Sequence, residues 1–167
     1  MIAPAYVQTM AAYNAEMNRR IYAAAGKMTD AERKEDRRLF WGSLHGTLNH
    51  LLWGDRTWMA RFADWPKPTH PIKQSGALYT DFSELSAERV RADAGISEWA
   101  AGVSQDWLEQ DLVWFSGSMQ REMKLPHRLC VTHMFNHQTH HRGQAHAALT
   151  WFGHDPGATD LPFVLGF

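Results

Sequence analysis

The strongest constraint on the fold is a helical spacing of apolar residues that recurs in four long segments of the chain. The first segment runs from Pro4 to about Ala25, and its apolar residues are Tyr6, Met10, Tyr13, Met17 and Ile21. Residues three or four positions apart share one face of an α-helix, so the segment is predicted to be an amphipathic helix. Proline suits the first turn of such a helix, and Gly26 suits its end.

Three further long helices are predicted at about residues 41–62, from 83 or 86 to about 105, and from 126 to 151 or 152. The sequence Thr29-Asp-Ala-Glu32 is a capping-box pattern and predicts a short charged turn after the first helix. Prolines and a glycine between residues 64 and 76 forbid a helix there and predict the longest irregular connection. Connections of this kind are often functional.

Between residues 112 and 125 the apolar spacing changes from helical to alternating. Alternation on both sides of Ser116-Gly-Ser118 predicts a short hairpin. The 167 residues, 44% of them hydrophobic, are enough for one well-buried core and too few for two. We therefore predict a single all-α domain over residues 1–167, an antiparallel four-helix bundle with a short hairpin-like insertion before the last helix.

Charge and composition argue against several classes of function. Seventeen basic and eighteen acidic residues give a net charge of −1 without a long basic run, so no nucleic-acid partner is expected. No segment approaches the roughly 18 apolar residues that cross a bilayer, so no membrane partner is expected. Cys130 is the single cysteine, which suits a reducing compartment and a small buried side chain. A cytoplasmic protein is predicted.

The last predicted helix carries a concentration of histidines that points to metal binding. Four of the ten histidines lie within nine residues, at positions 133, 137, 140 and 141. His137 and His141 are one helical turn apart, about 6 Å along the axis, so their rings can converge on one ion from the inward face. His133 and His140 lie nearer the rim, where they either orient a ligand or face solvent. The alternative for all four is a surface or hydrogen-bonded core histidine.

A zinc-like ion with an open coordination position takes three protein ligands, so a third ligand is expected from another helix. The second helix offers His45, His50 and Asp55. Helical periodicity alone does not choose cleanly among them. It places Asp55 inside the apolar stripe and the two histidines at or beyond its edges, which favours Asp55.

Three motifs resemble the DinB/YfiT-like superfamily of bacterial four-helix proteins over nearly the whole chain. They are Leu-Asn-His50-Leu-Leu-Trp-Gly-Asp-Arg-Thr-Trp58, Asn136-His-Gln-Thr-His-His-Arg-Gly-Gln144 and Asp160-Leu-Pro-Phe163. The resemblance implies a divalent ion, zinc or nickel, held by one histidine of the second helix and two of the last. Carried onto this sequence, those ligands are His50, His137 and His141.

The resemblance leaves Asp55 as a residue that supports the ligands or contacts substrate, with a surface ion pair to Arg56 or Arg142 as the alternative. Arg142 is a second candidate, because it follows the last ligand and a guanidinium can bind an anionic substrate group. Gly143 is expected where helices approach closely, although simple packing explains it and Arg142 equally well. No catalytic residue is identified beyond these candidates.

The motif His137-Gln-Thr-His-His141 differs from the zinc-peptidase motif at one position. Gln138 stands where that chemistry needs a carboxylate base, so a peptidase is not expected. Three neutral imidazoles leave an ion its full charge, which favours deprotonation of a bound thiol or water. By resemblance, thiols such as bacillithiol, mycothiol or glutathione are implied as small-molecule partners.

The leading functional prediction is a metal-dependent transferase in which an activated thiol attacks an electrophilic substrate. The alternatives are a metal-dependent hydrolase, with Asp55 or a loop residue as base, and a non-catalytic stress-response metal-binding dimer. A homodimer is expected because the resemblance implies pairing and because the tail Phe163–Phe167 is apolar. The tail folding over its own helices is the other possibility.

Overall fold

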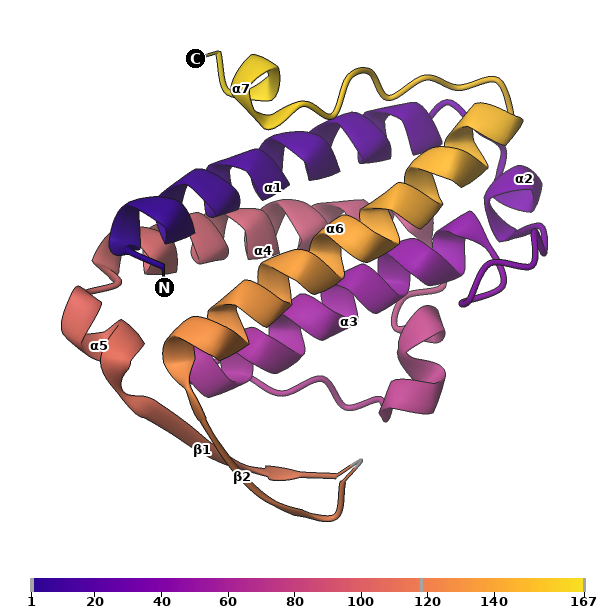
Figure 1. The fold of residues 1–167 in the computed structure, drawn as a ribbon. Helices are drawn as coiled ribbons and strands as arrows, with labels where there is room; N and C mark the ends of the chain where they lie inside the picture. The colour runs from indigo at the N-terminus through magenta and orange to yellow at the C-terminus, as the bar shows by residue number, and fades with distance from the viewer. Residues whose placement is uncertain (1, 118, 167) are drawn as a thin grey trace.

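Four long helices make up most of the computed structural model, which describes residues 2–117 and 119–166 (Figure 1). They are α1 (Pro4–Ala25), α3 (Leu44–Phe62), α4 (Phe82–Gly102) and α6 (His127–Trp151). The shorter elements are α2 (Asp30–Lys34), the 3-10 helix η1 (Ile72–Ala77), α5 (Gln105–Glu109), β1 (Asp111–Ser116), β2 (Arg121–Pro126) and α7 (Leu161–Val164). Among the described residues, no helix has both the length and the apolar character that crossing a membrane requires.

Side-chain caps fix the helix boundaries more sharply than apolar spacing does. Pro4 begins α1 as predicted, and the Thr29/Glu32 capping box begins α2 as predicted. The second long helix begins at Leu44 and not near residue 41, because the Ser43 hydroxyl accepts the backbone N–H of Gly46. The third covers 82–102 and not 83 or 86 to 105. Asp81 caps its start, and the chain has an extended conformation at residues 103 and 104.

The helices do not all alternate in direction. One apolar cluster joins the start of α1 and α6 to the end of α3 and α4, and a second cluster joins the opposite ends. Therefore α1 and α6 run one way, while α3 and α4 run the other (Figure 1). The predicted antiparallel packing holds for the pairs α1/α4 and α3/α6, but α1/α6 and α3/α4 are parallel. The cause is the connection 63–81, which carries η1 back along α3 before α4 begins.

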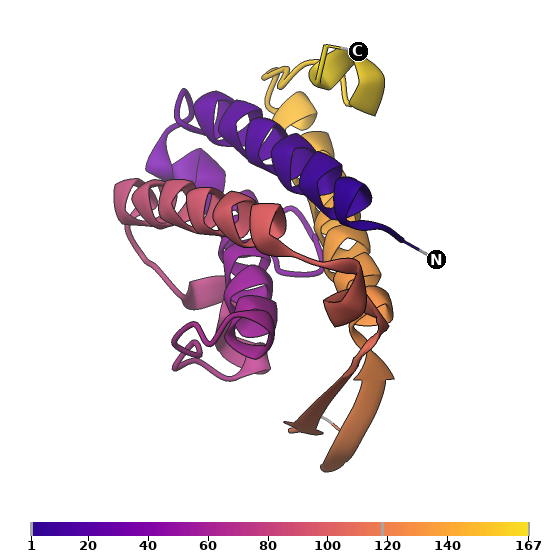
Figure 2. The ribbon, with the colours of Figure 1, turned by 90° about the vertical axis from the view of Figure 1, so that its left-hand side faces the viewer.

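The predicted hairpin lies directly before α6 and extends from the helices (Figure 2). Strands β1 and β2 pair antiparallel, with Leu112 opposite Leu125 and Ser116 opposite Arg121. Ser118 of the predicted turn lies outside the described residues. The sequence alternation therefore identified the hairpin correctly, and the hairpin leads the chain into the start of α6.

A buried polar network connects the four long helices. Arg89 of α4 forms an ion pair with Asp55 of α3 at 2.5 Å and another with Asp93 at 2.8 Å. From α1, the Asn18 amide donates to Asp93 at 2.9 Å, and from α6 the Gln138 amide donates to Asp55. Both Asp55 and Arg89 are almost completely buried. Buried charges are tolerated only when they are paired, so this network fixes how the helices face one another.

Replacing Asp55 with asparagine should destabilise the protein strongly, because Arg89 would lose its partner on α3 while remaining buried. We expect the free energy of unfolding to fall by about 3 kcal/mol, the lower end for a broken buried ion pair, since Asp93 still pairs with Arg89. Urea unfolding measures this change. The control Glu88→Gln removes a carboxylate from a partly exposed pairing with Arg91 and should cost less than about 1 kcal/mol. Equal losses would contradict the structural role of Asp55.

Candidate metal centre

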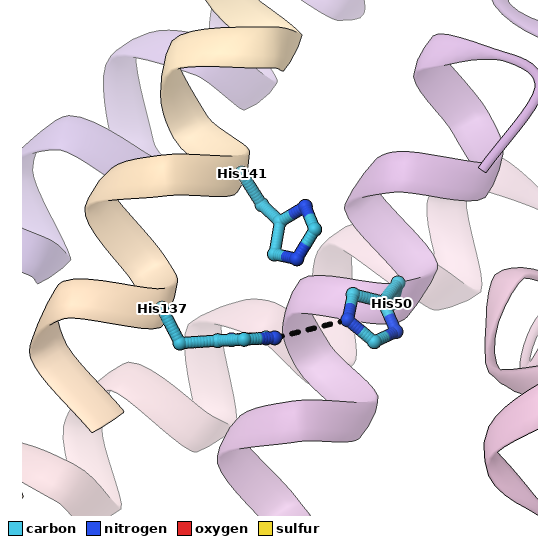
Figure 3. Close-up of side chains that lie close together, drawn as sticks. All are labelled: His50, His137 and His141. Carbon is cyan, nitrogen blue, oxygen red and sulfur yellow. Dashed lines mark hydrogen bonds between the residues drawn. The ribbon is translucent and has the colours of Figure 1, made fainter. Parts of the chain in front are cut away.

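Three histidines from two helices meet in one cluster (Figure 3). His137 and His141 project from α6 and His50 from α3, and one ring nitrogen of each lies within 4.8 Å of the others. The Nε2 atoms of His50 and His137 are 3.0 Å apart. Nitrogen ligands lie about 2 Å from a zinc ion, so two of them are about 3–4 Å apart. The cluster therefore has the donor type and the spacing for one ion.

The cluster depends on close approach of α3 and α6, which a glycine permits. A Cβ atom added at Gly54 would lie 2.9 Å from Cε1 of His137, a separation that real Cβ atoms do not show. With no side chain there, the His137 ring lies against the backbone of α3. His141 follows one turn later on the same face of α6, as the helical spacing predicts.

The outward ring nitrogens of two histidines have hydrogen-bond partners. Nδ1 of His50 lies 2.7 Å from the hydroxyl of Ser75, which is buried on η1. Nδ1 of His141 lies 2.9 Å from Oε1 of Gln144, so it must donate, and its Nε2 keeps a free lone pair. The Gln144 amide is itself oriented by His140, whose Nε2 accepts from it at 3.2 Å. Metal-binding histidines usually have such partners, so the surroundings also fit an ion.

Indole rings enclose His50. The ring of Trp41 stacks on it with 4.0 Å between centroids, and Trp53 lies nearly parallel at 5.9 Å. The stacking restricts rotation of the imidazole and covers it from solvent, so His50 is held in one orientation. Of the three histidines, His137 is the half-buried one, whereas His50 and His141 are buried.

Burial keeps the cluster neutral. Loss of solvation, followed by repulsion from the neighbouring imidazoles, lowers the pKa of His50 to about 3 and of His137 to about 4, against an ordinary value of 6.5. Burial lowers the pKa of His141 as well. An imidazole must be neutral to bind a metal through nitrogen, so all three are in the required form at pH 7.

The structure does not bring Asp55 and Arg142 into this cluster. Asp55 is paired with Arg89 in the core, so the alternative of a surface ion pair with Arg56 or Arg142 is wrong. Arg142 is also buried, donates to Oε1 of Gln138 at 2.8 Å and lies over the Tyr13 ring. These contacts direct both side chains toward α1 and α4. Neither is positioned as the sequence interpretation expected.

The remaining candidates fall on the outer part of α6. His133 is exposed against the ring of Trp58, and His140 is exposed beside Gln144. The expected packing role of Gly143 is wrong, because a Cβ there would contact nothing within 4 Å. Cys130 is free and buried, as predicted. Sequence reasoning missed Ser75 and Gln144. The spacing of Gln144 from His141 was a usable signal, whereas nothing local links Ser75 to His50.

Comparison with known protein families gives a match over nearly the whole chain. The profile of the DinB family matches residues 1–166, and the chain therefore belongs to the DinB family. Searches against curated proteins and against solved structures gave no match. The matched range contains all three clustered histidines.

Gly54→Ala should weaken metal binding although position 54 carries no donor atom. The added methyl group occupies the space of the His137 ring and displaces it, and we expect the dissociation constant for zinc to rise roughly 10–100-fold. Competition with a chelating dye measures it. Gly143→Ala is the matched control on α6 and should leave the affinity unchanged while stabilising the helix by about 0.5–1 kcal/mol. Equal affinities for both variants would show that the close approach is not required.

The metal-free protein should lose stability as the pH falls from 6.5 toward 4. Unfolded histidines take up protons near pH 6.5, whereas His137 does so near 4 and His50 near 3 in the folded chain, so protons favour unfolding across this interval. Burial raises the pKa of Asp55 to about 6 and opposes this trend. Urea unfolding of the wild type and of His50→Gln/His137→Gln should therefore be compared. Identical pH profiles would argue against the two histidines.

Proposed function

We propose that this DinB-family protein binds one divalent ion, zinc or nickel, through His50, His137 and His141, and uses it to activate a low-molecular-weight thiol for transfer to an electrophilic substrate. The observation that carries this proposal is the cluster of three neutral imidazoles whose ring nitrogens lie within 4.8 Å of one another, with hydrogen-bond partners for the outward nitrogens of His50 and His141. The family resemblance supports the same three residues. The proposal includes the fold: the four long helices form a bundle of the DinB type.

A divalent ion held there would lower the pKa of a neighbouring thiol well below its usual value near 8.5, so that thiolate is available at pH 7. The chain contributes the surroundings. Ser75 and Trp41 keep His50 in one orientation, and Gln144 fixes the tautomer of His141. In the transfer, sulfur forms the new bond to the electrophile, its proton passes to solvent, and the leaving group departs with the bonding electrons.

The donor set favours a thiol over water as nucleophile. Hydrolysis of an ester or amide is usually assisted by a positioned acid or base. Among the described residues, the histidine cluster contains no carboxylate, and Asp55, the predicted base, is occupied by Arg89. A thiol is far more acidic than water and has less need of a side-chain base. This difference supports transfer over hydrolysis.

Cobalt substitution tests the proposal. We expect one cobalt ion per chain and a new near-ultraviolet charge-transfer band when glutathione, bacillithiol or mycothiol is added, because sulfur would ligate the ion. His137→Ala/His141→Ala should lose the ion, whereas His70→Ala and His154→Ala, outside the cluster, should keep it. Elemental analysis and absorption spectra of untagged protein measure both effects.

Three results would count against the proposal. Full cobalt occupancy in the double variant would refute the ligand assignment. Absence of a thiol band, together with metal-dependent hydrolysis of an ester or amide library, would replace transfer by hydrolysis. If neither activity is detected, the non-catalytic metal-binding protein becomes the better description.

A homodimer and a cytoplasmic location complete the proposal. The tail packs along α1, where the Tyr13 hydroxyl donates to the carbonyl of Thr159 at 2.7 Å, yet the Phe163 side chain is 75% exposed. An exposed aromatic ring on an ordered helix supports a contact with a second copy. The lone buried Cys130 supports a reducing compartment. Light scattering should give twice the 19.1 kDa chain mass, and Phe163→Glu should give the monomer. A monomeric wild type rejects the dimer.

A further inference from the structure

A strip of side chains leads from the histidine cluster along the contact between α3 and α6. On α3, positions 50, 54, 58 and 61 recur at helical spacing and so share one face. On α6, His133 precedes His137 by one turn, with 6.0 Å between their ring centroids. Trp58 lies 5.2 Å from His133 across the two helices. The strip therefore continues from the cluster to Arg61, and its outer part is partly exposed.

Arg61 at the far end of this strip is a cation held by aromatic rings. Its guanidinium carbon lies 4.4 Å from the ring centre of Trp58 and 5.2 Å from that of Trp114 on β1. In the described part of the chain, no carboxylate forms an ion pair with it. Arg56, on the same helix, instead donates to the Tyr79 hydroxyl and lies 3.8 Å from Glu88. Arg61 thus differs from its neighbour in having aromatic contacts and no charged partner.

The indole contacts suit a guanidinium that binds an anion. Contacts with the rings of Trp58 and Trp114 hold the guanidinium of Arg61 beside two indoles, and in the described part of the chain none of its N–H groups is paired with a carboxylate. A carboxylate matches the N–H edge of a guanidinium in shape, and its single negative charge matches the single positive charge of Arg61. The guanidinium is consequently placed to accept a carboxylate from outside the chain.

The rise of α3 gives the separation of the backbone levels of Arg61 and the histidine cluster. Gly54 marks the level of His137 on α3, because the two residues are in direct contact. Arg61 follows Gly54 by seven residues, which corresponds to about 10 Å along the helix axis. A molecule that joins the cluster to Arg61 is therefore on the order of this length.

We propose that Arg61, in contact with the rings of Trp58 and Trp114, binds the carboxylate of a thiol whose sulfur reaches the histidine cluster, and so selects for an extended, anionic thiol. This inference rests on the proposed function. It assigns His133 and Trp58 to the wall between the two ends of the ligand, and it gives the start of α6 and strand β1 a part in selecting the substrate.

Binding of three thiols to the cobalt-loaded protein tests the proposal. Mercaptooctanoate has the required length and charge, mercaptooctanol has the length without the charge, and mercaptoacetate has the charge without the length. The dissociation constants follow from titration of the charge-transfer band. We expect the wild type to bind mercaptooctanoate roughly tenfold more tightly than either of the others, as a charge-assisted contact provides.

Variants of Arg61 and Arg56 test whether the preference for mercaptooctanoate depends on Arg61. Arg61→Gln should remove the preference for mercaptooctanoate over mercaptooctanol, and Arg61→Lys should retain part of it. Arg56→Gln makes the same change in net charge on the same helix and should keep the preference. Stoichiometric cobalt binding with an unchanged visible spectrum shows that each variant is folded.

The outcomes separate this inference from the function on which it rests. If thiols give the band but the wild type shows no preference, or Arg61→Gln keeps it, the carboxylate site is refuted and thiol binding stands. Loss of the preference in Arg56→Gln as well would reduce the effect to overall charge and also refute the site. If no thiol gives the band, the proposed function fails and the inference fails with it.

Discussion

The ion pair between Asp55 and Arg89 is the constraint on which the other helix contacts depend. Both groups are almost completely buried, and each charge is costly to bury unless the other is in place. Asp93 and Gln138 add hydrogen-bonding partners from α4 and α6. The apolar clusters at the two ends stabilise the assembly without fixing its rotation, because hydrophobic contact is non-directional. The polar network between the clusters has directional bonds, and these bonds fix how each helix is rotated about its axis.

This network and the histidine cluster are built on adjacent turns of α6. His137 and His141 project toward α3, while Gln138 and Arg142, one position further along, project toward α1 and α4. Successive residues of a helix are rotated by about 100°, so fixing one pair of side chains fixes the direction of the other. The core bonds of Gln138 therefore help to aim the neighbouring imidazole. Stability and ligand geometry share the same turns of one helix.

Sequence reasoning recovered local features well and long-range pairing poorly. Helical spacing found the four helices and the pair His137 and His141, because both depend on neighbours three or four positions away. The apolar stripe correctly predicted that Asp55 is buried, but burial was read as a sign of a ligand. Its partner Arg89 lies on another helix, and spacing within α3 carries no information about that contact.

The choice of a third candidate ligand shows the same limit. His50 was selected only by resemblance, since the helical wheel alone favoured Asp55. The sequence also did not predict that α4 runs parallel to α3. An irregular connection can lead either across the end of a helix or back along it. The prolines predicted a long connection, but they did not predict the path that it takes. Only the three-dimensional path shows that it runs beside α3.

That path has a consequence for the histidine cluster. Because α3 and α4 are parallel, the chain must return along the length of α3, and this return segment carries Ser75 to Nδ1 of His50. The same segment is attached to α3 by the Trp53 indole, which donates to the carbonyl of His70. A strictly alternating arrangement would join the two helices by a short turn at one end, with no residue behind this imidazole. The parallel direction of α3 and α4 thus determines whether Nδ1 of His50 has the Ser75 hydroxyl as a hydrogen-bond partner.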